Sequence, residues 1–150
     1  MHHARMNESH VAPHTAPTIL QLLETAASLE RRLDKALSCT RGISFSEYRL
    51  LLALSTSANG LPRIDLANSV GLTASAVTRA LKPLEKIGLV TTQKSERDAR
   101  QSLAVISAAG QKILTDADGV LQDVFRQLSI NKLGDNKVAE FQTRLAELKS

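Results

Sequence analysis

The sequence has no tryptophan, one tyrosine and three phenylalanines, so aromatic residues make up only 3% of its 150 residues. Its core therefore has to consist mainly of Leu, Ala, Val and Ile. The single cysteine, Cys39, has no partner for an intramolecular disulfide, which is typical of a reducing cytoplasm. No apolar run approaches the ~20 residues that cross a bilayer, and the N-terminus has no hydrophobic signal region. These absences predict a cytoplasmic protein without a membrane partner.

Histidine is missing from most of the chain, because all four histidines lie within the first fourteen residues. Residues 15–150 therefore lack the base of Ser-His-Asp or Cys-His catalysis and the imidazole ligands of common zinc sites. His10 and His14 have the spacing of metal ligands on a helix, but Pro13 disfavours a helix between them. The seven glycines form neither a G-x-G-x-x-G loop nor a P-loop. We expect no metal, no cofactor and no enzymatic activity.

Positive charge is concentrated in the middle of the chain. The whole sequence has 19 Lys and Arg against 15 Asp and Glu, a net charge of +4. Residues 60–106 contain seven basic and four acidic side chains, so most of the excess lies there. Such a region is where a polyanion such as DNA is expected to bind. So small an excess also fits an ordinary solvated surface, and charge alone therefore decides nothing.

Two helices are predicted before the basic region. Residues 18–38 have apolar side chains at helical spacing, with charged residues on the opposite side. A second helix is expected to begin at Ser44, because its hydroxyl group and the side chain of Glu47 can form a capping box. This helix ends before the turn at Asn59-Gly60. Its apolar positions include Tyr48, Leu51, Leu52 and Leu54.

Residues 61–90 have the pattern of two short helices joined by a tight turn. Pro62 suits the first turn of a helix, Gly71 suits the turn between helices, and Thr73 can cap the second helix. We expect Leu72 to fill the corner. Two such helices form a helix-turn-helix, which places its second helix in the major groove of DNA. The predicted buried residues are Leu66, Ala67 and Val70 in the first helix and Val77, Ala80, Leu81, Leu84 and Ile87 in the second.

The outward side of that second helix is short, polar and basic. Small side chains let a helix enter the major groove, where Arg79 and hydroxyl groups can hydrogen-bond to base edges. Alternatives stay open, since Arg79 could pair with Glu85 or Asp98, and Thr73 could serve only as a cap. Pro83 lies within the helix and is expected to bend its axis after the base-reading residues. The candidate DNA-binding residues are Thr73, Ala74, Ser75, Thr78, Arg79 and Lys82.

After Gly88 the apolar residues alternate with a period of two, which predicts β-strands over residues 89–93 and 102–106. The charged segment between them is a hairpin tip, and together they form a wing beside the second helix. Its candidate DNA contacts are Lys94, Arg97 and Arg100, through phosphates or a narrow minor groove. Asp98 would repel phosphate if it were unpaired, so we expect it to pair with an arginine and orient the wing.

Two further amphipathic helices are predicted over residues 108–128 and 135–149. Like the helix at 18–38, they have apolar stripes with no other domain to cover them. Pairing between two copies of the chain would bury these stripes, at about 25 cal/mol per Å² of apolar surface. In the alternative, the same helices pack on each other within a monomer. The predicted dimer-interface residues are Ile19, Leu22, Leu23, Val120, Val124, Phe125, Phe141 and Leu145.

Residues 61–110 resemble the MarR family of winged helix-turn-helix transcriptional regulators. The resemblance rests on ANSVGLTASAVTRALKPLEKIGLV, on the wing element Asp98-Ala99-Arg100 and on the segment ISAAG at residues 106–110. With the long flanking helices it covers residues 18–150. It implies a homodimer that binds a pseudo-palindromic operator, with contacts from Ser75, Thr78, Arg79 and Arg100. Many members release DNA when a small, often aromatic compound enters a cleft between the lobes, and others respond to cysteine oxidation.

The predicted architecture is mainly α-helical (α+β), a winged helix-turn-helix with a two-stranded wing between dimerisation helices. We expect a flexible tail at residues 1–17, an N-terminal dimerisation helix at 18–42, a DNA-binding lobe at 43–107 and C-terminal dimerisation helices at 108–150. The predicted function is a dimeric, sequence-specific regulator of transcription on double-stranded DNA, a repressor released by a small aromatic effector. The alternative is a winged-helix protein-interaction module that does not bind DNA.

Three residues have competing interpretations. Cys39 lies at the end of the first helix, whereas the cysteine of peroxide-sensing MarR relatives lies near its start. A buried or merely tolerated thiol is therefore the alternative to a redox role. Tyr48 and Arg49 are candidate residues of an effector pocket, although helix packing explains Tyr48 nearly as well.

Overall fold

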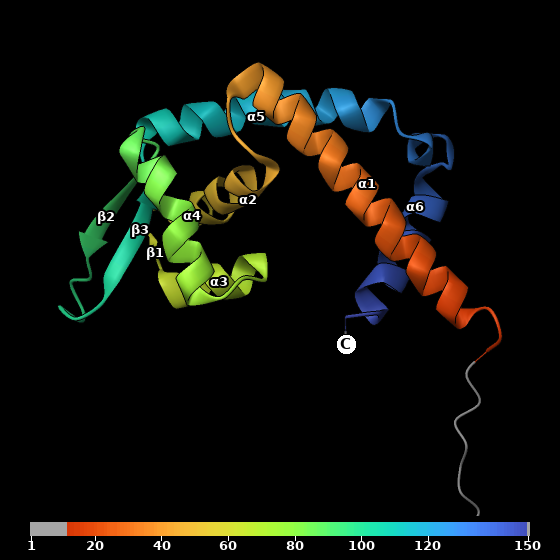
Figure 1. The fold of residues 1–150 in the computed structure, drawn as a ribbon, viewed down its shortest axis with the longest axis horizontal. Coiled ribbons are helices and arrows are strands. Elements are labelled where there is room, and N and C mark those ends of the chain that lie inside the picture. The colour runs from red at the N-terminus through yellow and green to blue at the C-terminus, as the bar shows by residue number, and fades with distance from the viewer. Residues whose placement is uncertain (1–11, 150) are drawn as a thin grey trace, which may run out of the picture. The chain divides into compact units, whose positions relative to one another are not determined.

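The computed structural model describes residues 12–149, so most of the predicted tail at residues 1–17 lies outside the described residues. The chain divides into two compact units, and the second begins at Leu33, within the first helix, and contains all the elements after that helix. This second unit has the predicted winged helix-turn-helix fold (Figure 1). The elements in chain order are α1 (Thr15–Arg41), α2 (Phe45–Ser55), β1 (Leu61–Pro62), α3 (Arg63–Val70), α4 (Ala74–Lys86), β2 (Val90–Lys94), β3 (Ser102–Ile106), α5 (Ala108–Arg126), the 3-10 helix η1 (Ser129–Lys132) and α6 (Asp135–Glu147).

Side-chain caps define where α2 and α4 begin. The hydroxyl of Ser44 accepts a hydrogen bond from the N–H of Glu47 at 3.0 Å, and the Glu47 carboxylate accepts one from the N–H of Ser44 at 2.9 Å. The predicted capping box is therefore present. Thr73 caps α4 by accepting from the N–H of Ala76 at 3.1 Å. Each cap satisfies an N–H group that has no carbonyl partner within its helix.

The end of α4 corrects one prediction. Ile87, expected in the buried stripe, is 60% exposed. Gly88 adopts a φ of +78°, and the N–H of Leu89 donates to the carbonyl of Leu84 at 2.9 Å. This is a Schellman motif, in which the residue after the left-handed glycine packs back against the last helical turn. Leu89 is therefore buried in the place that the helical pattern assigned to Ile87.

The turn between α3 and α4 corrects another prediction. Gly71 adopts a φ of +70°, as expected for a left-handed turn residue. Leu72, however, is 43% exposed and does not fill the corner. Val70, the last residue of α3, is buried in the core instead. The chain reverses immediately after Val70, which leaves Leu72 on the surface.

The wing belongs to a sheet of three antiparallel strands in the order β1-β3-β2, where two strands were predicted. β2 and β3 pair over their full lengths, with Thr92 opposite Ala104. The additional strand β1 has only two residues and pairs Leu61 with Ala104. Gly60, just before β1, lies so close to β3 that a Cβ atom there would be 2.6 Å from the carbonyl oxygen of Ala104. A larger residue at position 60 would displace β1 from the sheet.

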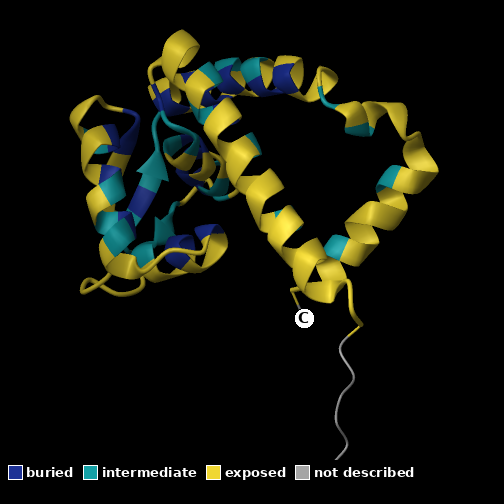
Figure 2. Cartoon of the chain, turned by 45° about the vertical axis from the view of Figure 1, so that its right-hand side comes forward, coloured by how far each residue is buried: buried dark blue, intermediate teal, exposed yellow. Residues whose placement is uncertain are grey.

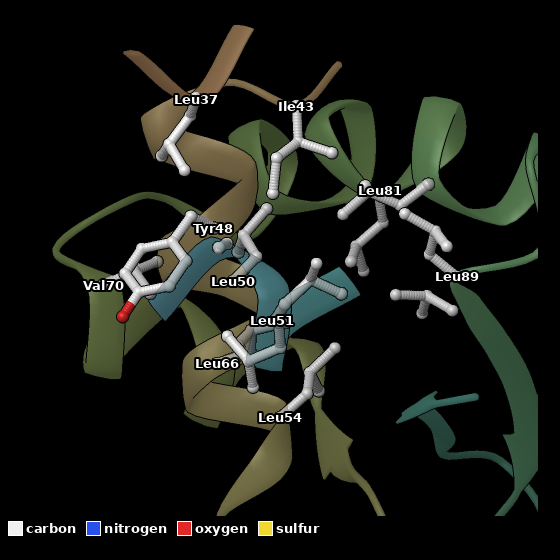
Figure 3. Packing of buried hydrophobic residues seen from close by; sticks show 14 of the residues in the cluster. Leu37, Ile43, Tyr48, Leu50, Leu51, Leu54, Leu66, Val70, Leu81 and Leu89 are labelled. Atoms are coloured by element: carbon white, nitrogen blue, oxygen red, sulfur yellow. The ribbon is translucent and has the colours of Figure 1, made fainter. Parts of the chain in front are cut away.

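The buried core of the described residues lies within residues 33–124 and is almost entirely aliphatic. Side chains from α2, α3 and α4 meet there, with contributions from the last turns of α1, from the wing and from α5 (Figure 3). This arrangement fixes α4 from its inner side. The largest fully buried side chains are Leu37, Leu50, Leu51, Leu54, Leu66, Val77, Leu81, Leu84 and Val90.

The first part of α1 and the whole of α6 are much more exposed than the core (Figure 2). Residues 15–32 of α1 contain no buried residue, and neither does α6. Both segments nevertheless carry large apolar side chains, since Leu23 is 60% exposed and Phe141 is 43% exposed.

Candidate nucleic-acid interface

The outward side of α4 is the centre of the candidate interface. Val77, Leu81 and Leu84 are fully buried, so the inner side of the helix is fixed in the core. Ala80 packs partly against the core as well, and the exposed positions lie on the opposite side of the helix. The predicted contact residues Thr73, Ala74, Ser75, Arg79 and Lys82 are all exposed, and Thr78 is half-buried.

An open depression of about 550 Å³ lies along the start of α4. Its lining consists of Arg63, Ala74, Ser75, Thr78 and Arg79, so it brings together four of the predicted contact residues. The Thr78 hydroxyl donates to the carbonyl of Ala74 at 3.1 Å, and its oxygen keeps acceptor capacity. The small side chains of Ala74 and Ser75 leave the helix backbone accessible to a large polyanion.

Pro83 does not interrupt α4, which continues to Lys86. Proline lacks an N–H group, so the carbonyl of Arg79 has no intrahelical donor at this position. The predicted contact residues all precede Pro83 and lie in regular helix or at its cap. A bend at Pro83 would leave their mutual spacing unchanged.

Backbone hydrogen bonds order the tip of the wing. The N–H of Ser95 donates to the carbonyl of Gln101 at 2.9 Å, and the N–H of Gln101 donates to the carbonyl of Asp98 at 3.0 Å. The Ser95 hydroxyl accepts from the N–H groups of Arg97 and Asp98. The tip is thus a defined turn that holds its basic side chains outward. Lys94, Arg97 and Arg100 are all exposed.

Asp98 shapes the wing by a contact that differs from the expected one. Its carboxylate accepts a hydrogen bond from the backbone N–H of Arg100 at 3.0 Å. No arginine side chain pairs with Asp98 among residues 12–149. The Asp98 charge is therefore partly satisfied by the backbone, while the Arg100 guanidinium stays available to an external anion.

Comparison with known proteins identifies the domain. Residues 43–102, which include α2, α3, α4, the wing tip and the start of β3, match the MarR family model. This domain belongs to the MarR family. No curated protein sequence matches the chain at a significant level.

Solved structures resemble the chain well beyond the MarR-family domain. Sco3205 from Streptomyces coelicolor, a MarR family regulator in complex with DNA, has 23% identity and a TM-score of 0.84, covering 93% of this chain and 89% of its own. AbsC from the same organism has 22% identity and a TM-score of 0.81, covering 93% and 95%. CouR from Rhodococcus jostii RHA1, bound to p-coumaroyl-CoA, has 21% identity and a TM-score of 0.77, covering 85% and 88%. At these identities the likeness establishes the fold.

Arg63 is a residue of the MarR-family domain that the sequence pattern did not single out. Its guanidinium lies 3.4 Å from the carboxylate of Glu85, so Glu85 pairs with Arg63 and not with Arg79. Within the described part of the chain, Arg79 has no acidic partner. The two members of the Arg63–Glu85 pair are 22 positions apart and follow no local pattern, so no sequence signal could have revealed the contact.

Tyr48 is explained by packing. Its side chain is only 8% exposed and stacks against Phe45, with ring centroids 6.1 Å apart. Its hydroxyl donates to Asp118 of α5 at 2.6 Å. Burial, reinforced by this hydrogen bond, raises the pKa of the Tyr48 phenol well above its ordinary value. Tyr48 therefore joins α2 to α5, while the neighbouring Arg49 lies exposed beside an open depression of about 300 Å³.

The predicted dimer-interface residues fall into two groups. Val124 is 8% exposed and belongs to the core of its own chain, so it has little surface left for a partner. The other seven are half-buried or exposed and lie on α1, α5 and α6. They are Ile19, Leu22, Leu23, Val120, Phe125, Phe141 and Leu145.

Cys39 is exposed near the end of α1. Of the four histidines, only His14 lies within the described residues. No group of three or more His, Cys, Asp or Glu side chains in residues 12–149 is arranged to hold a metal ion. Over the same residues, none of the helices has the length and apolar character needed to cross a membrane.

Proposed function

We propose that this chain is a sequence-specific DNA-binding regulator of transcription that acts as a homodimer on a pseudo-palindromic operator. The observation that carries the proposal is the outward surface of α4. Ser75 and Arg79 are exposed there, and Arg79 has no acidic partner among the described side chains. A helix with small residues at its start and an available arginine in its second turn suits the major groove.

Base reading and phosphate binding are divided between different residues in this proposal. Arg79 donates to acceptor atoms of guanine, and Ser75 and Thr78 contact neighbouring base edges. The N-terminal end of α4 at Thr73 and the ammonium of Lys82 contact phosphates. The wing adds phosphate or minor-groove contacts through Lys94, Arg97 and Arg100.

Homodimerisation is proposed from the exposed apolar surface of the terminal helices. α6 has 13 residues and none is buried, yet an isolated helix of this length is only marginally stable in water. Contact with a second copy would cover Phe125 and Phe141, which are 38% and 43% exposed. Residues 18–42 and 108–150 are then dimerisation segments, and residues 43–107 are the DNA-binding lobe. Two-fold symmetry would place the two α4 helices in successive major grooves, about 34 Å apart.

We further propose that the regulator is a repressor that a small aromatic molecule releases from DNA. CouR, whose fold resembles this one, is bound to p-coumaroyl-CoA, which supports an aromatic effector. An effector can lower the affinity for DNA only if it binds more tightly to the arrangement of the two lobes that does not bind DNA. The size of the decrease is set by the difference between its affinities for the two arrangements. A screen of aromatic acids and their thioesters for release of a bound duplex tests this part.

DNA binding itself is tested by selection of duplexes from a random pool. We expect enrichment of an inverted repeat whose half-site centres are one helical turn apart. Sedimentation should give the mass of two chains alone and of two chains per enriched duplex. Affinity should fall linearly on a log–log salt plot, because phosphate contacts release counterions. If the folded protein enriches no sequence, DNA binding is excluded and the protein-interaction alternative replaces it.

A further inference from the structure

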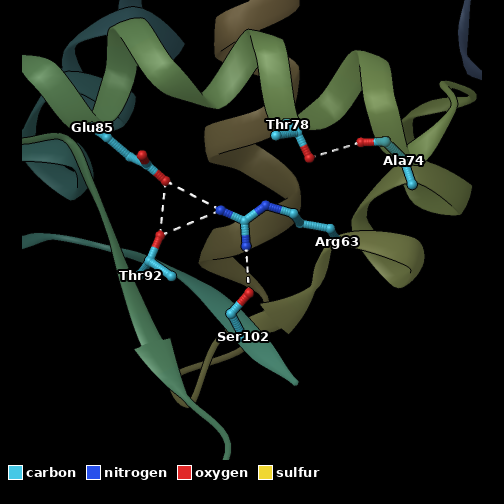
Figure 4. A network of polar contacts seen from close by, with 6 residues as sticks. All are labelled: Arg63, Ala74, Thr78, Glu85, Thr92 and Ser102. Atoms are coloured by element: carbon cyan, nitrogen blue, oxygen red, sulfur yellow. Dashed lines mark hydrogen bonds and ion pairs between the residues drawn. The ribbon is translucent and has the colours of Figure 1, made fainter. Parts of the chain in front are cut away.

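One guanidinium connects four elements of the MarR-family domain (Figure 4). Arg63 is the first residue of α3, and its Nη1 donates to the hydroxyl of Ser102 on β3 at 2.9 Å. Its Nη2 lies 3.4 Å from Glu85 Oε1 on α4 and 3.4 Å from the Thr92 hydroxyl on β2. Thr92 closes the network by donating to the same Glu85 oxygen at 2.8 Å. The contacts therefore join the DNA-facing helix to both strands of the wing.

The network is better shielded from water than the other ion pairs of the described residues. The side chains of Arg63 and Glu85 are 23% and 32% exposed, whereas those of Arg126 and Asp123 are 73% and 71% exposed. Exposed pairs contribute little, because water screens them and two flexible side chains must be ordered. The planar guanidinium holds its donors in a fixed fork, so it can serve three acceptors on different elements. A lysine ammonium cannot reproduce that arrangement.

The network also lies between the two candidate DNA-contacting surfaces. Ser102 pairs with Lys94, the last residue of β2, so the network reaches the end of the strand pair where the wing tip begins. On its other side Arg63 lines the depression beside Ser75 and Arg79. Because β2 and β3 are neighbouring strands, fixing one residue of each against α4 fixes the direction in which the wing projects.

We propose that Arg63 is a positioning residue, which holds the wing so that Arg100 reaches DNA while Arg79 occupies the major groove. Arg63 acts through the wing and does not itself contact DNA. The inference rests on the proposed DNA binding and adds to it a residue that is not among the predicted DNA contacts. It predicts that the contribution of Arg100 to affinity depends on Arg63.

Two substitutions separate positioning from charge. Arg63→Gln removes both the fork and the charge, while Arg63→Lys keeps the charge and removes the fork. If Arg63 positions the wing, each variant binds the selected duplex about tenfold more weakly than the wild type. If Arg63 is only a phosphate contact, Arg63→Lys binds like the wild type, and the proposal is overturned. Arg126→Gln, which removes an arginine from an exposed pair, is the matched control and should bind like the wild type.

A double-mutant cycle then tests the dependence directly, with Arg100→Ala as the second change. Positioning predicts that Arg100→Ala weakens binding about tenfold in the wild type and less than about threefold in Arg63→Lys. The same coupling should vanish on a duplex shortened so that the wing has no DNA to contact. Equal effects of Arg100→Ala in both backgrounds would overturn the inference.

Thr92→Val tests the same network without changing Arg63, so the result does not depend on whether the Arg63 variants fold normally. Thr92 is exposed, so its substitution leaves the core intact, but it removes the hydroxyl that links β2 to Glu85. We expect Thr92→Val to lower the affinity for the selected duplex about threefold and to leave the melting temperature unchanged. This loss should again depend on whether Arg100 is present. Additive effects would count against positioning. Wild-type protein that binds no duplex overturns the proposed function as a whole, whereas wild-type binding with an additive cycle overturns only the role of Arg63.

Discussion

The winged lobe and α6 differ in what stabilises them. The lobe shares a core of aliphatic side chains with the last turns of α1 and with α5, and capping residues and a shielded polar network around Arg63 add to its stability. α6 has regular helical structure and a stripe of apolar residues, but none of its residues is buried. The lobe is therefore stabilised within one chain, while the apolar stripe of α6 stays exposed, as the proposed homodimer predicts. A dimeric DNA-binding protein needs both features, because a rigid lobe holds the DNA-contacting side chains and separate helices can join the two chains.

The largest expected effect concerns the core of the lobe. Leu81→Ala removes a fully buried side chain from α4, next to the predicted DNA-contacting residues. It should lower the free energy of unfolding by about 2–5 kcal/mol, from lost transfer energy and the cavity left behind. Urea denaturation followed by circular dichroism measures it at several protein concentrations. A loss below ~1 kcal/mol would mean that the lobe is not the self-contained unit described above.

A smaller effect, with a different signature, is expected in the terminal helix. Phe141→Asp introduces a charge on the exposed apolar surface of α6. We expect the dissociation constant of the dimer to rise roughly 10- to 100-fold, while the lobe keeps its secondary structure. Analytical ultracentrifugation gives the dissociation constant, and Glu140→Gln serves as a control on the same helix. An unchanged constant would favour the monomer alternative.

The smallest predicted effect lies where α2 meets α5. Because burial and the bond to Asp118 raise the pKa of Tyr48, the unfolded chain loses its phenolic proton first as the pH rises. The free energy of unfolding should therefore fall above a pH of about 10, where the unfolded tyrosine ionises and the folded one does not. Tyr48→Phe should abolish this pH dependence and cost ~1 kcal/mol at neutral pH.

The measurement is unusually clean, since Tyr48 is the only tyrosine and the chain has no tryptophan. Tyrosinate absorbance therefore reports this residue alone. Ionisation of the folded protein at an ordinary tyrosine pKa would contradict the buried hydrogen bond.

Local features of the fold were predictable, whereas contacts between distant residues were not. The caps at Ser44 and Thr73 involve partners three positions away, so their signal is in the sequence itself. The two-residue strand β1 has no periodicity to detect. Ile87 was misplaced because extending the helical stripe ignored the reversal of the chain at Gly88.

The same distinction applies to the candidate interface. The exposed side of α4 follows from the apolar stripe opposite it, which the spacing of Val77, Leu81 and Leu84 reveals. The Arg63 network depends on tertiary folding, which brings α3, α4 and the wing together. Asp98 was expected to act on the wing, but its backbone acceptor role depends on a turn geometry that composition does not encode.

We propose that Arg79, on the exposed side of α4, reads base edges. The most direct measurement compares wild type, Arg79→Ala and Lys82→Ala on the selected duplex and on a scrambled duplex, over a range of salt concentrations. We predict that Arg79→Ala loses about 1–3 kcal/mol of discrimination between the two duplexes, while Lys82→Ala keeps it and reduces the log–log salt slope by about one. If Arg79→Ala still discriminates between the two duplexes as the wild type does, Arg79 does not read base edges.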